Sequence, residues 1–166
     1  MKYVTRVLQP GETVVYATTL HWLVYFRAVV LLLIGVGLLV AAAMVGDRGV
    51  TISGNPEYTK YLVTALQILA ALFVVFAILS ALRALIRRTT TELAITDRRV
   101  IYKAGLLRRH TIEINRSKVE TVGVNQSILG RVMGFGTVVV RGTGGSFEPI
   151  PFIAEPLTFR NHITAG

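Results

Sequence analysis

The sequence predicts an α+β membrane protein: a two-helix transmembrane hairpin followed by a small antiparallel β-domain that ends in a short helix. Two long runs without charged residues predict the hairpin. A two-residue alternation of apolar and polar side chains, which begins after Thr89, predicts the β-domain. Hydrophobic residues make up 52% of the chain, but they are concentrated in the two runs.

The two uncharged runs cover residues 28–46 and 61–82. As a helix, the first would be about 28 Å long, close to the hydrocarbon thickness of a bilayer. The second is apolar all round except for Thr64, Gln67 and Ser80, so it is not an amphipathic helix. A domain of this size has no core able to surround two such helices, and both runs are therefore predicted to span a membrane.

A cleaved signal peptide is the alternative for the first run, because the small residues 41–43 resemble a cleavage site. The preceding 27 residues, which include Pro10 and Gly11, are longer than a signal sequence needs before its apolar region. We therefore interpret this run as an anchor.

Basic residues predict the orientation of the hairpin. Arg27 precedes the first span, Arg83, Arg87 and Arg88 follow the second, and the external loop of residues 47–60 carries balanced charges. The positive-inside rule then places both termini in the cytoplasm. The predicted segments are an N-terminal cytoplasmic segment (1–22), the transmembrane hairpin (23–88) and a cytoplasmic domain (89–166).

Six strands are expected in the cytoplasmic domain, at residues 91–96, 100–103, 109–114, 118–124, 137–141 and 147–153. A helical insert is expected at residues 126–133, and a closing helix at residues 155–163 with Pro156 in its first turn. Many short strands with short connections indicate a strongly bent antiparallel sheet or a small barrel. Residues 14–17 also have strand-like content, and we expect them to pack against this barrel.

The sequence carries few residues that indicate chemistry. The chain has no cysteine, and His21, His110 and His162 lie in separate segments without metal-ligand spacing. Nucleophile, phosphate-loop and calcium-loop motifs are missing, and the glycines of residues 130–145 follow no βαβ pattern. We therefore expect no catalytic residue, cofactor or metal, and no enzyme. The charges are not interleaved with aromatic residues, so no nucleic-acid partner is expected either.

Two sets of residues are candidates for binding. Arg87, Arg88, Arg108 and Arg109 form basic clusters of the kind that attracts anionic lipid headgroups. The alternative is that the first two only set topology and the others lie on a solvated loop. The second set lies in the second span, where Ala77 and Ala81 permit close helix packing and the Gln67 amide requires a hydrogen-bond partner. That partner is either another chain or the first span.

The chain resembles the bacterial pleckstrin-homology (PH)-like membrane proteins, which combine two transmembrane helices with a cytoplasmic PH-like domain. The resemblance covers nearly the whole chain, and its motifs are residues 8–12, 21–22, 93–103, 105–107, 125–131, 134–136 and 150–153. It implies a PH-like barrel or split sheet with a short C-terminal helix, in the bacterial cytoplasmic (inner) membrane. Eukaryotic PH domains that bind phosphoinositides gather basic residues between their first two strands, whereas the expected connection here is the short turn of residues 96–99.

Two functions follow as expectations. The first is a non-enzymatic, membrane-anchored interaction module: an accessory, assembly or scaffold subunit that binds another integral membrane protein or forms a homo-oligomer. The alternative is an anionic-lipid-sensing domain at the membrane surface, in which the four arginines contact membrane lipids.

Overall fold

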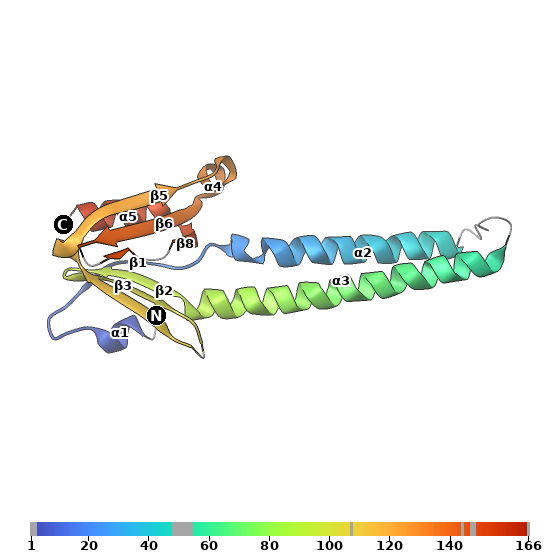
Figure 1. Ribbon diagram of the computed structural model, residues 1–166, viewed down its shortest axis with the longest axis horizontal. Helices are drawn as coiled ribbons and strands as arrows, with labels where there is room; N and C mark the ends of the chain where they lie inside the picture. Colours follow the sequence, from blue (N-terminus) through green and yellow to red (C-terminus); the bar gives the residue numbers. More distant parts are fainter. Residues whose placement is uncertain (1–2, 48–54, 107, 144, 147–148, 166) are drawn as a thin grey trace. The chain divides into compact units, whose positions relative to one another are not determined.

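The structure is a computed structural model that describes residues 3–47, 55–106, 108–143, 145–146 and 149–165. It contains two compact units (Figure 1). The first, which we call the β-unit, combines Met1–Val24 with Ile86–Gly166. The second, the helical unit, is Tyr25–Leu85. Each unit is described by itself.

Two long helices form the helical unit. Helix α2 covers Phe26–Asp47, after the short 3-10 helix η1 (Trp22–Tyr25), and α3 covers Pro56–Thr90. Both are long and apolar enough to cross a membrane, and they contain the two predicted spans. Helix α3 begins at Pro56, so residues 56–60, predicted as the end of the external loop, are helical. Residues 48–54 of that loop lie outside the described part of the chain.

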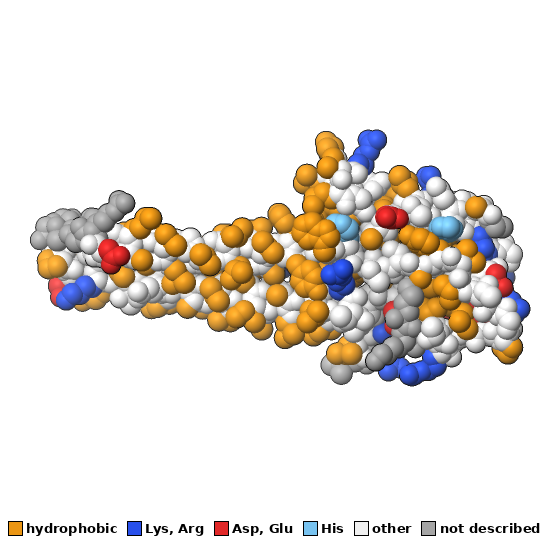
Figure 2. Space-filling view, turned by 180° about the vertical axis from the view of Figure 1, so that it is seen from behind, with side chains coloured by type: hydrophobic (Ala, Val, Ile, Leu, Met, Phe, Trp, Pro, Cys, Tyr) orange, Lys and Arg blue, Asp and Glu red, His pale blue; other side chains and the backbone are white. Residues whose placement is uncertain are grey.

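A seam of small residues joins α2 and α3, which run side by side in Figure 1. The buried residues recur every seven positions, at Ala28, Gly35 and Ala42 of α2 and at Ala70, Ala77 and Ala84 of α3. This period keeps them on one face of each helix, and small side chains let the two backbones approach closely. The large apolar side chains point outward along both helices, as Figure 2 shows.

Gly35 is the tightest point of the seam. A Cβ atom built there would lie 3.0 Å from Val74 Cγ2 and 3.3 Å from the Ala70 carbonyl oxygen. We expect Gly35→Leu to destabilise the helix pair by about 1–3 kcal/mol, because the helices must separate to admit the side chain. Unfolding of the full-length protein in detergent, followed by circular dichroism, measures the effect. Gly37→Leu is the control, since nothing lies within 4 Å of that position; equal losses would contradict the seam.

The β-unit contains two antiparallel sheets. The first has the order β1-β2-β3-β4, and in the second β6 pairs with β5, β7 and β8. The strands are β1 (Val14–Thr18), β2 (Glu92–Thr96), β3 (Arg99–Ala104), β4 (His110–Asn115), β5 (Val119–Asn125), β6 (Phe135–Gly142), β7 (Gly145–Ser146) and β8 (Ile150–Ala154). The mixed α+β class with antiparallel sheets is therefore confirmed. Residues 147–148 of the last predicted strand lie outside the described residues.

Strand β1 changes the expected order of the domain. It precedes both long helices and pairs with β2, with Thr18 opposite Leu93. The turn of residues 96–99 therefore joins β2 to β3, and the expectation that it connects the first two strands is wrong. The actual connection between the first two strands contains α2 and α3. Strand β1 is short and half exposed, and its backbone pairs with the edge of β2. This pairing is what makes the segment a strand.

One core joins the two sheets and the last helix, α5 (Pro156–Thr164). Its buried members are Leu93, Ile95, Val100, Val138, Val140, Ile150, Ile153, Phe159 and Ile163. A second cluster covers the other face of the first sheet, where Val4 of helix α1 (Val4–Val7) packs on Ala94 and Ile101. Strand β2 is consequently buried on both faces.

Candidate interaction surface

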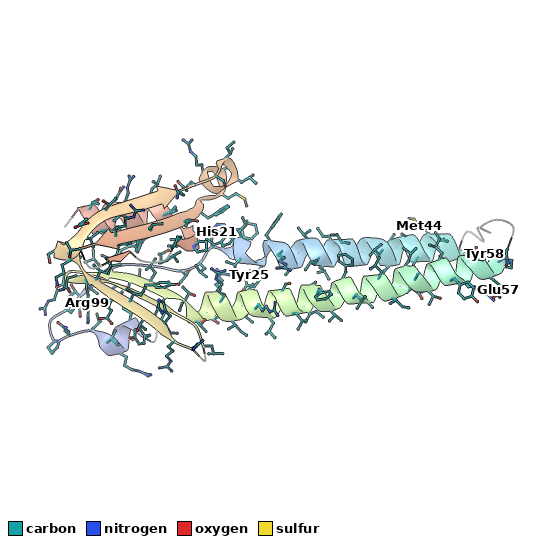
Figure 3. The ribbon with its side chains drawn as sticks, viewed as in Figure 1. His21, Tyr25, Met44, Glu57, Tyr58 and Arg99 are labelled. Carbon is teal, nitrogen blue, oxygen red and sulfur yellow. The ribbon has the colours of Figure 1, made fainter. Side chains whose placement is uncertain are left out.

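Several features of the β-unit converge on the end from which both long helices leave, which we call the exit end. The chain leaves the β-unit at Val24 and re-enters it at Ile86. At this end Leu20, which follows β1, forms a bridge with Ile153 of β8, so the two sheets meet there. In the first sheet, Glu92 of β2 lies opposite Lys103 of β3 at the same end. In Figure 3, His21 marks this end of the β-unit and Arg99 marks the opposite end.

Basic side chains gather on the exit end. The turn that joins β3 to β4 lies beyond the Glu92–Lys103 pair and carries the exposed Arg108 and Arg109. Arg87 and Arg88, also exposed, precede β2 at the same end of the sheet. The Lys103 ammonium donates a hydrogen bond to the Thr90 carbonyl oxygen over 2.9 Å. The fold therefore brings the two predicted basic clusters to one end, although residue 107 of that turn lies outside the described part.

An aromatic cluster lies beside the point where α2 begins. The His21 ring stacks on Phe135 at 5.4 Å and Phe135 stacks on Phe152 at 6.0 Å. The His21 backbone N–H donates to the Phe152 carbonyl oxygen over 2.6 Å. Burial, and then the nearby Arg88 charge, lower the pKa of His21. The cluster therefore holds a neutral imidazole at neutral pH.

The short helix α4 (Ile128–Met133) joins β5 to β6 at this end. It was predicted only as a helical insert, and no role was assigned to it. Besides Arg131, its exposed side chains are apolar, and three of them are at least two-thirds exposed: Ile128, Leu129 and Val132. The sequence did contain a local signal for this surface, namely the apolar residues in a connection between two strands. Exposed apolar residues that lie together on a surface often mark an interaction site.

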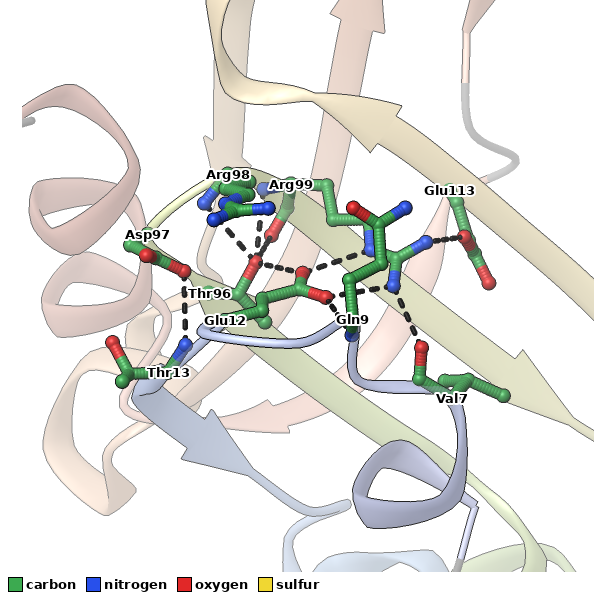
Figure 4. Close-up of polar contacts among 9 residues, drawn as sticks. All are labelled: Val7, Gln9, Glu12, Thr13, Thr96, Asp97, Arg98, Arg99 and Glu113. Carbon is green, nitrogen blue, oxygen red and sulfur yellow. Dashed lines mark hydrogen bonds and ion pairs between the residues drawn. The ribbon is translucent and has the colours of Figure 1, made fainter.

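The opposite end of the β-unit carries a buried ion pair (Figure 4). The Arg99 guanidinium donates to both carboxylate oxygens of Glu12, at 2.9 and 2.8 Å, and also reaches Glu113. The Thr96 hydroxyl and the Gln9 backbone N–H also donate to Glu12, whose side chain is fully buried. The hydrogen bonds from Arg99 hold the pKa of Glu12 at about 2, although burial raises it. This carboxylate is fully used in fastening the N-terminal segment to the first sheet.

The predicted contacts of the second span are separated in the structure. Ala77 is buried in the seam with α2, and both Ala77 and Ala81 line an apolar hollow of about 220 Å³ between the two helices. The Gln67 side chain is exposed on the outside of the helix pair. It makes no side-chain hydrogen bond within the described residues, and the two partners considered for its amide, another chain and the first span, both stay predictions.

Within the described residues, no group of three or more metal-ligating side chains is found. Two antiparallel sheets that share one core, closed by a C-terminal helix and bearing exposed arginines and apolar side chains at one end, form a small β-rich domain. The sequence profile of the bacterial PH domain family matches residues 13–165, and the chain belongs to this family. Domains of this kind are generally non-catalytic interaction modules. Searches of curated proteins and of solved structures gave no match.

Proposed function

We propose that this protein is a membrane-anchored PH-like interaction module, an accessory, assembly or scaffold subunit that binds another integral membrane protein or its own copies. Its location would be the bacterial cytoplasmic membrane, and the arginines that flank the spans support a cytoplasmic position of both termini. The exposed amide of Gln67 is the observation that carries the partner proposal.

The argument for a partner rests on the cost of an unpaired amide in lipid. Gln67 is exposed on a helix whose large exposed side chains in this stretch, Ile68, Leu69 and Leu72, are apolar and suited to hydrocarbon. No water is available there to satisfy the amide, whereas a polar side chain or backbone group on a neighbouring helix can do so. A helix from another chain is therefore the fitting partner for this face of α3.

The test is mass spectrometry of everything that copurifies with the tagged full-length protein in a lipid-retaining copolymer. We expect stoichiometric recovery of another membrane protein or of a second copy. Gln67→Leu should lower this recovery roughly three- to thirtyfold, because an interhelical hydrogen bond contributes about 0.6–2 kcal/mol. Ile68→Leu, at an exposed apolar neighbour, is the matched control and should change nothing.

The same experiment separates the lipid-sensing alternative, which the convergence of Arg87, Arg88, Arg108 and Arg109 on the exit end supports. Recovery of the protein as a lone copy with enriched anionic lipid would favour that function. Recovery as a lone copy without lipid enrichment would contradict both functions.

A further inference from the structure

Helix α4 has the reverse of the usual arrangement of a surface helix. A surface helix normally turns apolar residues inward and polar residues outward. In α4 the inward residue is Gly130, which is buried, whereas Ile128 is 84% exposed, Val132 81% and Leu129 67%. Because exposed apolar area costs about 25 cal/mol per Å², such a surface in water is unfavourable. The arrangement suits an apolar environment outside the protein.

The local structure holds these side chains outward. The Ser127 hydroxyl caps the helix by accepting a hydrogen bond from the Gly130 N–H over 3.1 Å. The Gln126 amide donates to the Phe135 carbonyl oxygen over 3.0 Å, which ties the helix base to β6. A Cβ atom at Gly130 would lie 2.7 Å from that same oxygen, so only glycine lets α4 lie this close to the strand. The exposed face is therefore a built feature and not a frayed loop.

The position of α4 in the fold indicates which environment its exposed apolar side chains contact. Phe135 follows the helix directly and stacks on His21, the residue before η1, where the chain enters the first apolar helix. The backbone of Met133, the last residue of α4, lies close enough to the His21 ring to raise its pKa in part. Trp22, half exposed, lies against the His21 ring at 5.4 Å. Tryptophan at the end of a membrane helix is typical of the lipid–water interface, so residues close to Trp22 are expected near the level of this interface.

The charges near α4 agree with a lipid surface. Arg131 is exposed within the helix, on the side away from the core. Arg88 lies close enough to His21 to lower its pKa, so a second arginine borders the same region. Apolar side chains flanked by arginine are typical of segments that lie in the headgroup region of anionic membranes.

From this arrangement we infer that α4 inserts Ile128, Leu129 and Val132 into the interface of an anionic phospholipid bilayer. This inference rests on the membrane anchoring in the proposed function. An insertion of this kind reaches about 5–10 Å into the boundary of headgroups and acyl chains. Such an insertion would fix the orientation of the β-unit against the membrane. The two chain connections at Val24 and Ile86 do not by themselves require one particular orientation.

The chain lacks cysteine, so one introduced thiol can carry a single environment-sensitive fluorophore. Three full-length variants are reconstituted in vesicles that contain anionic phospholipid: Val132→Cys in α4, Leu33→Cys in the middle of α2, and Glu120→Cys at the far end of β5. All three positions are exposed. Quenching is measured with nitroxide-labelled lipids and with aqueous iodide. We expect a nitroxide near the headgroups to quench the Val132→Cys label at least about threefold more than the Glu120→Cys label.

Every outcome decides between the possibilities. Lipid quenching at Val132→Cys and Leu33→Cys, but not at Glu120→Cys, supports the inference. Lipid quenching at Leu33→Cys alone overturns the insertion and leaves the anchoring intact. Absence of lipid quenching at Leu33→Cys overturns the anchoring and the inference with it. A Val132→Cys label that is shielded from iodide but not reached by lipid nitroxide is covered by protein, which also overturns the inference.

Discussion

A fragment of residues 89–166 is expected to remain unfolded, without a cooperative thermal transition, although it contains seven of the eight strands. It lacks β1, and β2 would then become an edge strand whose residues are otherwise all buried. It also lacks Val4 and Leu20, both buried, and Glu12, the buried one of the two carboxylates that pair with Arg99. Circular dichroism during heating measures the result.

The matched control is a chain that joins residues 1–24 to 86–166 through a flexible glycine–serine linker, so that all of the β-unit is present. We expect this chain to unfold in a single transition, because small single domains usually do so. If the shorter fragment unfolds with the same midpoint as the joined chain, the N-terminal segment is not part of the domain, and the division into two units is contradicted.

The fragment boundary at Thr89 shows both the strength and the limit of sequence reasoning. The change of period after the second span correctly locates the start of β2, because the alternation of apolar and polar residues is a local property of the sequence, although β2 is in fact buried on both faces. Strand β1 lies more than seventy residues earlier and is paired through Thr18 and Leu93. No local pattern encodes a partner at that distance, so the same reasoning bounded the domain at residues 89–166 and expected residues 14–17 only to pack against it, not to pair with β2.

The candidate surface was predicted in part for the same reason. The basic residues were visible as clusters, and the hairpin of β3 and β4 follows from alternating residues. That Arg87 and Arg108 lie at one end of the sheet depends on strand register, which only the fold shows. The outward face of α4 depends on the packing of Gly130 against β6, and the pattern of apolar and polar residues does not predict this contact.

The buried ion pair predicts the second large effect. We expect Glu12→Gln to lower the free energy of unfolding of the β-unit by about 3 kcal/mol, at the lower end of the range for breaking a buried pair, because Arg99 keeps Glu113 as a partner. Trp22 is the only tryptophan and lies in the β-unit, so its fluorescence during denaturant unfolding of the full-length protein measures the loss. Glu120→Gln, at an exposed position, is the control and should change stability by no more than about 0.5 kcal/mol.

The acid dependence of the same protein tests whether the charge itself is responsible. Folding lowers the pKa of Glu12 from 4.5 to about 2, so its ionised form favours the folded state. This contribution is fully present above pH 4.5 and is lost as the pH falls from 4.5 towards 2. Glu12→Gln has no carboxyl to protonate there, and its stability should fall less steeply across this window than that of the unaltered protein or of Glu120→Gln. Parallel acid profiles would mean that Glu12 supports the fold through its shape and neutral hydrogen bonds and not through its pairing with Arg99.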